Sequence, residues 1–300
     1  MPPPDPPEGS LVGTEWLAEH LSDPNLVVAD MRWREDGSGR VLYERGHVPG
    51  AVFVDWATDL VDPEHEVAFM LAPPERFAAV MERCGIGDDT TVVAYADRFG
   101  SGPFRLWWAG RVYGHDQVLV LDGGLDRWLA EGRPLADEPT RPRRGVRWNP
   151  RPAASPAAVA EDVTAAASRP DVVVLDSRPG SQFRGEAVWF ETGPVPAGPD
   201  GIARTPRGDL RAGHVPWAVS VPARDLYRDD GTLKTPEELR GMFARFGATE
   251  DKGAIAYCGV GVSASALLFA LHRAGIERAA LYDASWEEWG RDPSRPVARG

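Results

Sequence analysis

Short apolar runs alternate with amphipathic stretches along most of the 300-residue chain. The amphipathic stretches repeat apolar residues three and four positions apart and predict helices, whereas the short apolar runs predict buried strands. This alternation is typical of a mainly parallel α/β sheet flanked by helices. The predicted helices cover residues 14–21, 74–84, 104–113, 125–131, 155–167, 236–246, 262–273 and 286–289, with Thr14 as the N-cap of the first. The predicted strands cover residues 91–95, 117–121, 172–176, 218–221, 254–257 and 279–282.

The same series of motifs occurs twice, which indicates two copies of one structural unit. An apolar run that ends in Asp-x-Arg occurs at Asp30 and again at Asp176. The motif Gly-His-Val-Pro follows at Gly46 and again at Gly213. Because both copies contain Asp-x-Arg and the histidine, we expect these residues to be structural. The other matching blocks are 91–95 with 254–257, and 121–124 with 282–285.

Counting back from the last matching block aligns a carboxylate of the first copy with a thiol of the second. Asp97 lies 25 residues before Asp122, and Cys258 lies 25 residues before Asp283. An alignment without gaps therefore places Asp97 opposite Cys258. This predicts that the second copy carries the chemistry and that the first is catalytically silent.

The repeat also predicts the division of the chain into domains. We expect a disordered, proline-rich tail at 1–10, a first domain at 11–135, a linker rich in proline and arginine at 136–154, and a second domain at 155–300. The second copy is about 21 residues longer than the first, mainly at 185–208. Long insertions in compact domains are often functional, so we expect this insertion to act as a lid or specificity loop.

Cys258 lies between a predicted strand and a predicted helix. Gly259 and Gly261 permit a tight loop there, and the helix begins at Val262. Amide groups at a helix N-terminus lack helical acceptors, and the helix dipole adds positive charge, so this place favours a reactive thiolate. The alternative is a cysteine buried as a small apolar side chain. That second role is the one we expect for Cys84, which ends a predicted helix.

Composition and charge exclude several classes of protein. The chain has 43% hydrophobic and 26% charged residues, enough to build ordinary cores, and its net charge of -12 argues against nucleic acid as a partner. No apolar run is long enough to cross a membrane, and the N-terminus lacks the features of a signal peptide. Two cysteines suit neither a disulfide framework nor a zinc site. We therefore expect a cytoplasmic protein without a membrane partner, metal or cofactor.

The duplicated motifs, in this order along nearly the whole chain, resemble the tandem-domain rhodanese sulfurtransferases. The resemblance implies two rhodanese-like domains, each a mainly parallel sheet flanked by helices, with the catalytic cysteine in the second. It also implies a ping-pong reaction through a Cys258 persulfide. The sulfur would come from a small anionic donor, thiosulfate or 3-mercaptopyruvate. It would pass to cyanide or to a thiol, such as a thioredoxin-like protein or a low-molecular-weight thiol.

The loop after the cysteine is expected to bind the donor and to hold the persulfide with its amide groups. Its sequence is closer to the Cys-Gly-Ser-Gly-Val-Thr-Ala of 3-mercaptopyruvate sulfurtransferases than to the Cys-Arg-Lys-Gly-Val-Thr-Ala of thiosulfate enzymes. Val260 replaces a hydroxyl residue to which the family assigns a catalytic role, and Phe69 replaces a histidine that precedes Met-Leu-Pro. The predicted substrate-binding residues of the loop are Gly259, Val260, Gly261, Val262 and Ser263.

Arg184 is the predicted contact for the anionic group of the donor, since a guanidinium pairs well with a carboxylate or a thiosulfonate. A surface ion pair is the alternative role for this residue. The family has a further donor-binding arginine where this chain has Gln182. Weaker candidates for the same contact are Arg204, Arg207 and Arg211.

Two other functions are compatible with parts of the sequence. A cysteine phosphatase also places a thiolate in a loop at a helix N-terminus, but it needs an arginine six positions later to bind the phosphoryl group. Ala264 occupies that position in this chain. A non-catalytic binding or regulatory protein with the rhodanese fold would not need Cys258.

Overall fold

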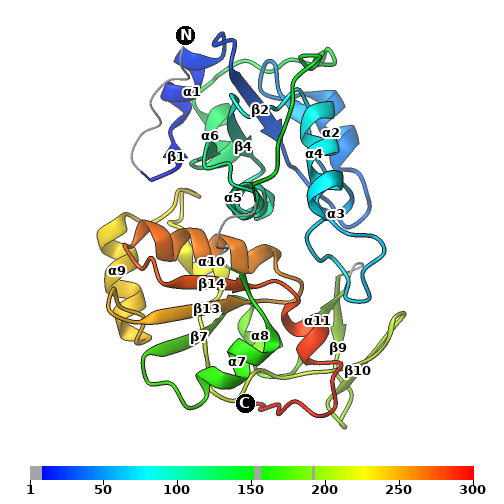
Figure 1. The fold of residues 1–300 in the computed structure, drawn as a ribbon, viewed down its shortest axis with the longest axis vertical. Coiled ribbons are helices and arrows are strands. Elements are labelled where there is room, and N and C mark those ends of the chain that lie inside the picture. The colour runs from blue at the N-terminus through cyan, green and yellow to red at the C-terminus, as the bar shows by residue number, and fades with distance from the viewer. Residues whose placement is uncertain (1–8, 152–156, 191–192) are drawn as a thin grey trace. The chain divides into compact units, whose positions relative to one another are not determined.

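The structure is a computed structural model that describes residues 9–151, 157–190 and 193–300 (Figure 1). These residues form two compact units, one built mostly from the N-terminal half of the chain and one mostly from the C-terminal half. Two short segments are exchanged between them: residues 227–233 belong to the N-terminal unit, and residues 64–70 belong to the C-terminal unit. None of the described helices is both long and apolar enough to cross a membrane.

The N-terminal unit is built on a five-stranded parallel sheet with the order β1-β5-β4-β2-β3. The central strand β4 is buried at every position, as expected for a parallel sheet covered on both faces. The sheet thus confirms the fold class predicted from the sequence. The strands are β1 (Leu11–Val12), β2 (Leu26–Asp30), β3 (Val52–Phe53), β4 (Thr91–Tyr95) and β5 (Val118–Leu121).

The helices of this unit include the four that were predicted, with shifts of one or two residues at their ends. The N-cap of the first helix was predicted wrongly: Gly13 is the cap, and Thr14 is the first helical residue. The Thr14 hydroxyl instead donates to the carboxylate of Glu131 over 2.5 Å. The helices are α1 (Thr14–His20), α2 (Gly39–Arg45), α3 (Trp56–Asp59), α4 (Pro74–Arg83), α5 (Gly102–Val112) and α6 (Gly124–Ala130).

The predicted linker packs on the N-terminal unit as far as residue 151, and its last residues, 152–154, lie outside the described part of the chain. The indole of Trp148 is buried against the rings of Phe77 and His115. Arg143 donates to the side chains of Asn25 and Thr90. Residues 136–151 are therefore fixed to the surface of this unit although most of them lack regular structure.

The C-terminal unit has a second five-stranded parallel sheet, with the order β12-β7-β13-β14-β6. Read from β6, this is the strand order of the first sheet, as the sequence repeat requires. The short strand β6 was not predicted, and the helix expected over 155–167 begins only at Ala160. Residues 155 and 156 lie outside the described part. The strands are β6 (Ala157–Ala158), β7 (Val172–Asp176), β12 (Ala218–Ser220), β13 (Gly253–Tyr257) and β14 (Ala279–Tyr282).

The longest described helix of this unit, α10, has the bounds that the sequence predicted. It packs along β13 and β14 and is apolar on most of its surface, which suits a helix buried against a sheet (Figure 1). The helical elements are α7 (Ala160–Ala166), α8 (Gly180–Phe183), α9 (Pro236–Arg245), α10 (Val262–Arg273), α11 (Ser285–Trp289) and the 3-10 turn η1 (Ala223–Leu226).

The insertion of the second copy forms two antiparallel ribbons, β8 with β9 and β10 with β11. Arg211 holds the second ribbon to the chain beyond α11 by donating to the carbonyl oxygens of Trp289, Gly290, Asp292 and Arg295. Arg211 was a weaker candidate for donor binding, but these contacts make it a structural residue. The strands are β8 (Ala187–Phe190), β9 (Gly193–Pro196), β10 (Ile202–Thr205) and β11 (Gly208–Arg211).

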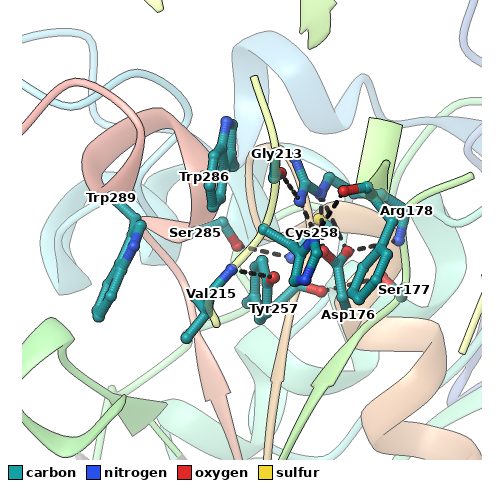
Figure 2. Close-up of polar contacts among 12 residues, drawn as sticks. Asp176, Ser177, Arg178, Gly213, Val215, Tyr257, Cys258, Ser285, Trp286 and Trp289 are labelled. Atoms are coloured by element: carbon teal, nitrogen blue, oxygen red, sulfur yellow. Dashed lines mark hydrogen bonds and ion pairs between the residues drawn. The ribbon is translucent and has the colours of Figure 1, made fainter. Parts of the chain in front are cut away.

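The Asp-x-Arg motif forms a buried ion pair in each unit. Arg178 Nη2 lies 2.6 Å from Asp176 Oδ2, and the same nitrogen donates to the Gly213 carbonyl oxygen over 2.7 Å (Figure 2). In the N-terminal unit, Arg32 binds Asp30 and the carbonyl oxygen of Gly46 in the same way. The motif therefore ties the end of a strand to the start of Gly-His-Val-Pro, which confirms its structural role.

The strand register corrects the predicted alignment of the two copies by one residue. Tyr95 pairs with Asp30 at the end of β4, and Tyr257 pairs with Asp176 at the end of β13. Each tyrosine hydroxyl also accepts the amide of the valine in Gly-His-Val-Pro. The residue after Tyr95 is Ala96, so Ala96 and not Asp97 lies opposite Cys258. The N-terminal copy has one more residue between this point and α6 than the C-terminal copy has before α11, and an alignment without gaps misses it.

Candidate active site

Cys258 follows the last residue of β13 and precedes α10, as the sequence predicted. Its side chain is 2% exposed. β13 is buried at all five positions, so the strand is fixed in the core up to the cysteine. Gly261 has a φ of +78° at the N-cap of α10, a conformation that favours glycine. The loop can therefore turn sharply from the strand into the helix.

The backbone of this loop is held by the first turn of α11. The amide of Trp286 donates to the carbonyl oxygen of Cys258 over 3.0 Å, and the amide of Glu287 donates to that of Gly259 over 2.9 Å. Ser285 Oγ accepts the Cys258 amide over 3.0 Å (Figure 2). The same hydroxyl donates to the Tyr282 carbonyl oxygen over 2.8 Å. The carbonyl groups of the loop are thus turned toward α11.

The amide groups that follow the cysteine remain available. Within the described residues, the amides of Gly259, Val260, Gly261 and Val262 donate to no carbonyl oxygen or side chain. This is the expected state of amides at the beginning of a helix, which have no acceptor one turn earlier. Consecutive unpaired amides next to a sulfur form a local anion site. The arrangement suits a negative charge on or next to the Cys258 sulfur.

The remaining side chains of the loop are apolar or paired. Val260 and Val262 are buried, whereas Gly259 and Ser263 are half-buried. Ser263 does not cap α10; its hydroxyl oxygen lies 3.1 Å from that of Ser177, which follows β7. The five predicted loop residues are therefore in one place beside Cys258, and none of them brings a positive charge.

Behind the loop, Tyr257 joins the buried ion pair to the cysteine strand. Burial, with the neighbouring Asp176 carboxylate, raises the pKa of the Tyr257 phenol well above its usual range. The phenol thus stays protonated, and its oxygen accepts the Val215 amide over 3.2 Å. Arg178 lies over the ring of Trp286, with its Cζ 4.4 Å from the ring centroid. These contacts connect Gly-His-Val-Pro, β13 and α11 behind the cysteine (Figure 2).

Arg184 and Arg204 are held in ion pairs on the surface, and Arg207 is exposed as well. Arg184 is 52% exposed and lies 2.7 Å from Glu186, which is the alternative role considered for it. Water screens such an exposed pair, so a ligand can compete for the guanidinium at little cost. Arg204 pairs with Asp200 and Asp209. Donor binding by Arg184 stays a prediction.

The two repeated histidines have structural contacts. His214 stacks on Phe183, with ring centroids 3.6 Å apart, and its Nδ1 lies 2.8 Å from the Phe183 carbonyl oxygen. His47 stacks on Tyr43 and has its Nδ1 2.9 Å from the Tyr43 carbonyl oxygen. In each copy the histidine ring thus fixes the Gly-His-Val-Pro motif to an aromatic residue earlier in the chain. This is the structural role expected for residues present in both copies.

Ser285 is a site residue that the sequence analysis missed. It has a φ of +52°, unusual for a residue other than glycine, and its side chain is fully buried. Its equivalent in the N-terminal unit is Gly124, with a φ of +56°. The sequence contained a signal for it: the block 121–124 matches the block 282–285, but the glycine at 124 corresponds to the serine at 285.

The Ser285→Ala variant is expected to loosen the cysteine loop. The buried Cys258 amide would lose its acceptor, which costs about 1–3 kcal/mol of unfolding free energy. We also expect turnover to fall by about tenfold or more, because small displacements of a reacting group are costly. Urea denaturation and steady-state rates measure the two effects. Ser285→Gly suits the backbone angle but should not restore turnover; wild-type turnover in either variant would contradict the assigned role.

The second cysteine, Cys84, ends α4 and is buried, as predicted. Burial raises the pKa of its thiol from 9.0 to about 11, with smaller effects from nearby charged residues. A protonated, buried thiol is a poor nucleophile. Cys84 is therefore suited to the core and not to sulfur transfer.

The raised pKa of Cys84 predicts a loss of stability at high pH. Above pH 9 the unfolded chain loses the thiol proton, while the folded chain keeps it until about pH 11, so stability falls through this window. The contribution is about 2 kcal/mol by pH 11, because each pKa unit corresponds to about 1.4 kcal/mol. Urea denaturation at pH 8 to 11 should show a smaller decline for Cys84→Ala than for the wild type. Parallel curves would contradict the prediction.

Comparison with known proteins identifies the class to which this fold and site belong. The family model of the rhodanese-like domain matches residues 13–131 and 159–292. The chain is 35% identical to the 3-mercaptopyruvate sulfurtransferase of Escherichia coli K12, covering 95% of this chain and 96% of the relative. It is 34% identical to the thiosulfate sulfurtransferase of Rattus norvegicus, covering 97% and 96%.

A solved structure agrees with this assignment. The crystal structure of SseA from Escherichia coli, described as a 3-mercaptopyruvate sulfotransferase with the rhodanese fold, matches with a TM-score of 0.78 and 32% identity. The match covers 92% of this chain and 98% of that one. The chain belongs to the rhodanese family, with two rhodanese-like domains in tandem. Within that family it is a sulfurtransferase, as the resemblance of its motifs predicted.

Proposed function

We propose that Cys258 is the nucleophile of this sulfurtransferase and that the N-terminal domain is catalytically silent. The observation that supports this most strongly is the set of unpaired amides, 259–262, at the start of α10 beside the cysteine. The N-terminal domain has Ala96 at the equivalent place and no cysteine in the loop that follows. An alanine can neither attack a donor nor carry a sulfur.

The proposed reaction has two halves. The Cys258 thiolate attacks the donor sulfur that is transferred, which is the outer sulfur of thiosulfate or the thiol sulfur of 3-mercaptopyruvate. A new S–S bond forms, and the bond between that sulfur and the rest of the donor breaks. Thiosulfate leaves as sulfite; 3-mercaptopyruvate leaves as pyruvate, with the thiol proton moving to carbon. The persulfide anion then gives its outer sulfur to cyanide or to a thiolate, and the Cys258 thiolate is regenerated. The loop amides stabilise the negative charge on sulfur in both halves.

The donor is proposed as thiosulfate or 3-mercaptopyruvate. The two relatives are 35% and 34% identical to this chain and are named for different donors, so overall similarity does not show which donor this chain prefers. Arg184 is the proposed contact for the donor anion, because its ion pair with Glu186 is exposed and exchangeable. A thiol is the proposed cellular acceptor, either a thioredoxin-like protein or a low-molecular-weight thiol, and the cytoplasm remains the expected location.

Mass spectrometry of the full chain tests the proposal. After incubation with donor and removal of the excess, the protein should gain about 32 Da, one sulfur atom, on the peptide that contains Cys258. Addition of cyanide or dithiothreitol should reverse the gain. A protein that gains no sulfur from either donor, or gains it at Cys84, would contradict the proposal.

Comparison of both donors on the wild type and on Val260→Ser identifies the preferred donor. If the missing hydroxyl limits the reaction with 3-mercaptopyruvate, the variant should raise turnover with that donor and leave turnover with thiosulfate unchanged. Equal changes with both donors would argue against a special role of position 260.

A further inference from the structure

An aromatic pair stands next to the cysteine loop. Phe69 and Trp189 meet edge to face, with ring centroids 5.8 Å apart, and both side chains are half-buried. They come from distant parts of the sequence: Trp189 lies on β8 of the insertion, and Phe69 lies in the segment 64–70 that belongs to the C-terminal unit. Neither residue belongs to the repeated motifs.

Trp189 is held against the loop by the residue before it. Val188 is buried in the core of the C-terminal unit, and successive residues of a strand point to opposite sides. A Cβ built on Gly259 would lie 3.6 Å from the Cβ of Trp189 and 4.0 Å from its ring. Trp189 therefore packs directly beside the residue that follows Cys258.

Phe69 is fixed in an unusual backbone conformation. Its φ is +63°, which bulky residues seldom adopt, and such outliers concentrate at functional sites. The neighbouring Met70 and, two residues earlier, Val67 pack against the core of the C-terminal unit. The segment is thus anchored on both sides of Phe69, and the ring is kept at Trp189.

The polarity of this surface indicates the kind of donor it favours. The two half-buried rings meet beside the cysteine loop through Trp189, and that loop, residues 258–263, has two buried valines and no cation. A small inorganic dianion gains little from rings, whereas a planar apolar group stacks on them or meets them edge to face. The rings thus suit a donor that carries such a group next to its sulfane sulfur.

On the basis of the proposed function, we propose that Phe69 and Trp189 determine donor specificity and favour organic donors with an aromatic group. An aromatic thiosulfonate represents this class. The Cys258 thiolate attacks the outer sulfur, the S–S bond of the persulfide forms, and the bond between the two donor sulfurs breaks. The donor leaves as the aromatic sulfinate with the electron pair of that bond. No proton, oxidant or reductant is required.

Two probe donors that differ only in the apolar group test the proposal. Benzenethiosulfonate and methanethiosulfonate undergo the same reaction, and the rate of sulfinate release gives kcat/KM for each. In Trp189→Leu, which keeps apolar volume but loses the ring, the ratio of the benzene to the methane donor should fall by about fivefold to tenfold. Phe69→Leu should lower it in the same direction, and Trp189→Phe should restore most of it.

Phe99 offers a matched control. It also has a positive φ, +70°, and meets an aromatic ring, that of Tyr227 at 5.2 Å, but it lies in the N-terminal unit. Phe99→Leu should leave the donor ratio unchanged. If both donors load Cys258 and the ratio is the same in the wild type, Trp189→Leu and Phe69→Leu, the specificity role is overturned and the proposed function stands. If neither thiosulfonate, thiosulfate nor 3-mercaptopyruvate loads Cys258, both are overturned.

Discussion

Replacing Cys258 with serine is expected to lower sulfur transfer by at least about 10³-fold, whichever donor is used. A serine hydroxyl stays protonated at neutral pH and is a weak nucleophile toward sulfur, whereas a cysteine thiolate is a strong one. The substitution adds no bulk at this buried position, so the fold should be retained. Steady-state rates with thiosulfate and 3-mercaptopyruvate measure the loss, and circular dichroism checks the fold.

Cys84→Ala is the matched control for this prediction. It removes the only other cysteine of the chain, whose thiol burial keeps protonated, and should retain at least about half of the wild-type turnover. Substantial activity in Cys258→Ser, or its loss in Cys84→Ala with the fold intact, would assign the chemistry to another group.

Replacing Arg178 with methionine is expected to lower the unfolding free energy by about 3–5 kcal/mol. Asp176 is 0% exposed and Arg178 is 2% exposed, so the variant leaves a buried carboxylate without its partner. The Gly213 carbonyl oxygen loses its donor as well. Urea denaturation followed by tryptophan fluorescence measures the change, because the guanidinium lies over Trp286.

Two further variants separate the cost of breaking the pair from the contribution of the pair itself. Asp176→Leu combined with Arg178→Met should recover part of the lost stability, since no unpaired charge remains. Arg32→Met breaks the equivalent pair in the N-terminal unit, where Arg32 is 6% exposed, and should cost a similar amount. A change of less than about 1 kcal/mol in both single arginine variants would contradict a structural role for the motif.

Local sequence patterns predicted most of the two parallel sheets and the place of the cysteine. The run before Cys258 is buried at every position, and α10 has the expected bounds, because strand and helix there follow from apolar periodicity and two glycines. The repeat predicted two copies of one structural unit, and the equal strand orders of the two sheets confirm it. The repeat gave the wrong partner for Cys258, because the count from Asp122 and Asp283 assumed no gap. The spacing from the matched tyrosines contains the extra residue: 27 positions from Tyr95 to Asp122 and 26 from Tyr257 to Asp283.

Contacts between distant residues set the limits of prediction. The ribbons of the insertion depend on pairing across Pro- and Gly-rich sequence, and Ser285 depends on an amide 27 residues earlier in the chain. Phe69 was noted only as a departure from the family pattern. Its contact with Trp189 joins segments 120 residues apart, and no local periodicity encodes such a distance.

The exchanged segments determine how the chain can be divided into halves. Segment 227–233 completes the N-terminal unit: Leu233 donates its amide to Asp122, and the Asp229 carbonyl oxygen accepts from Arg98. Segment 64–70 gives the C-terminal unit Phe69. A cut at the linker would therefore leave each half without a part that it needs. Each half, expressed alone from such a cut, would lack contacts that it makes in the full chain.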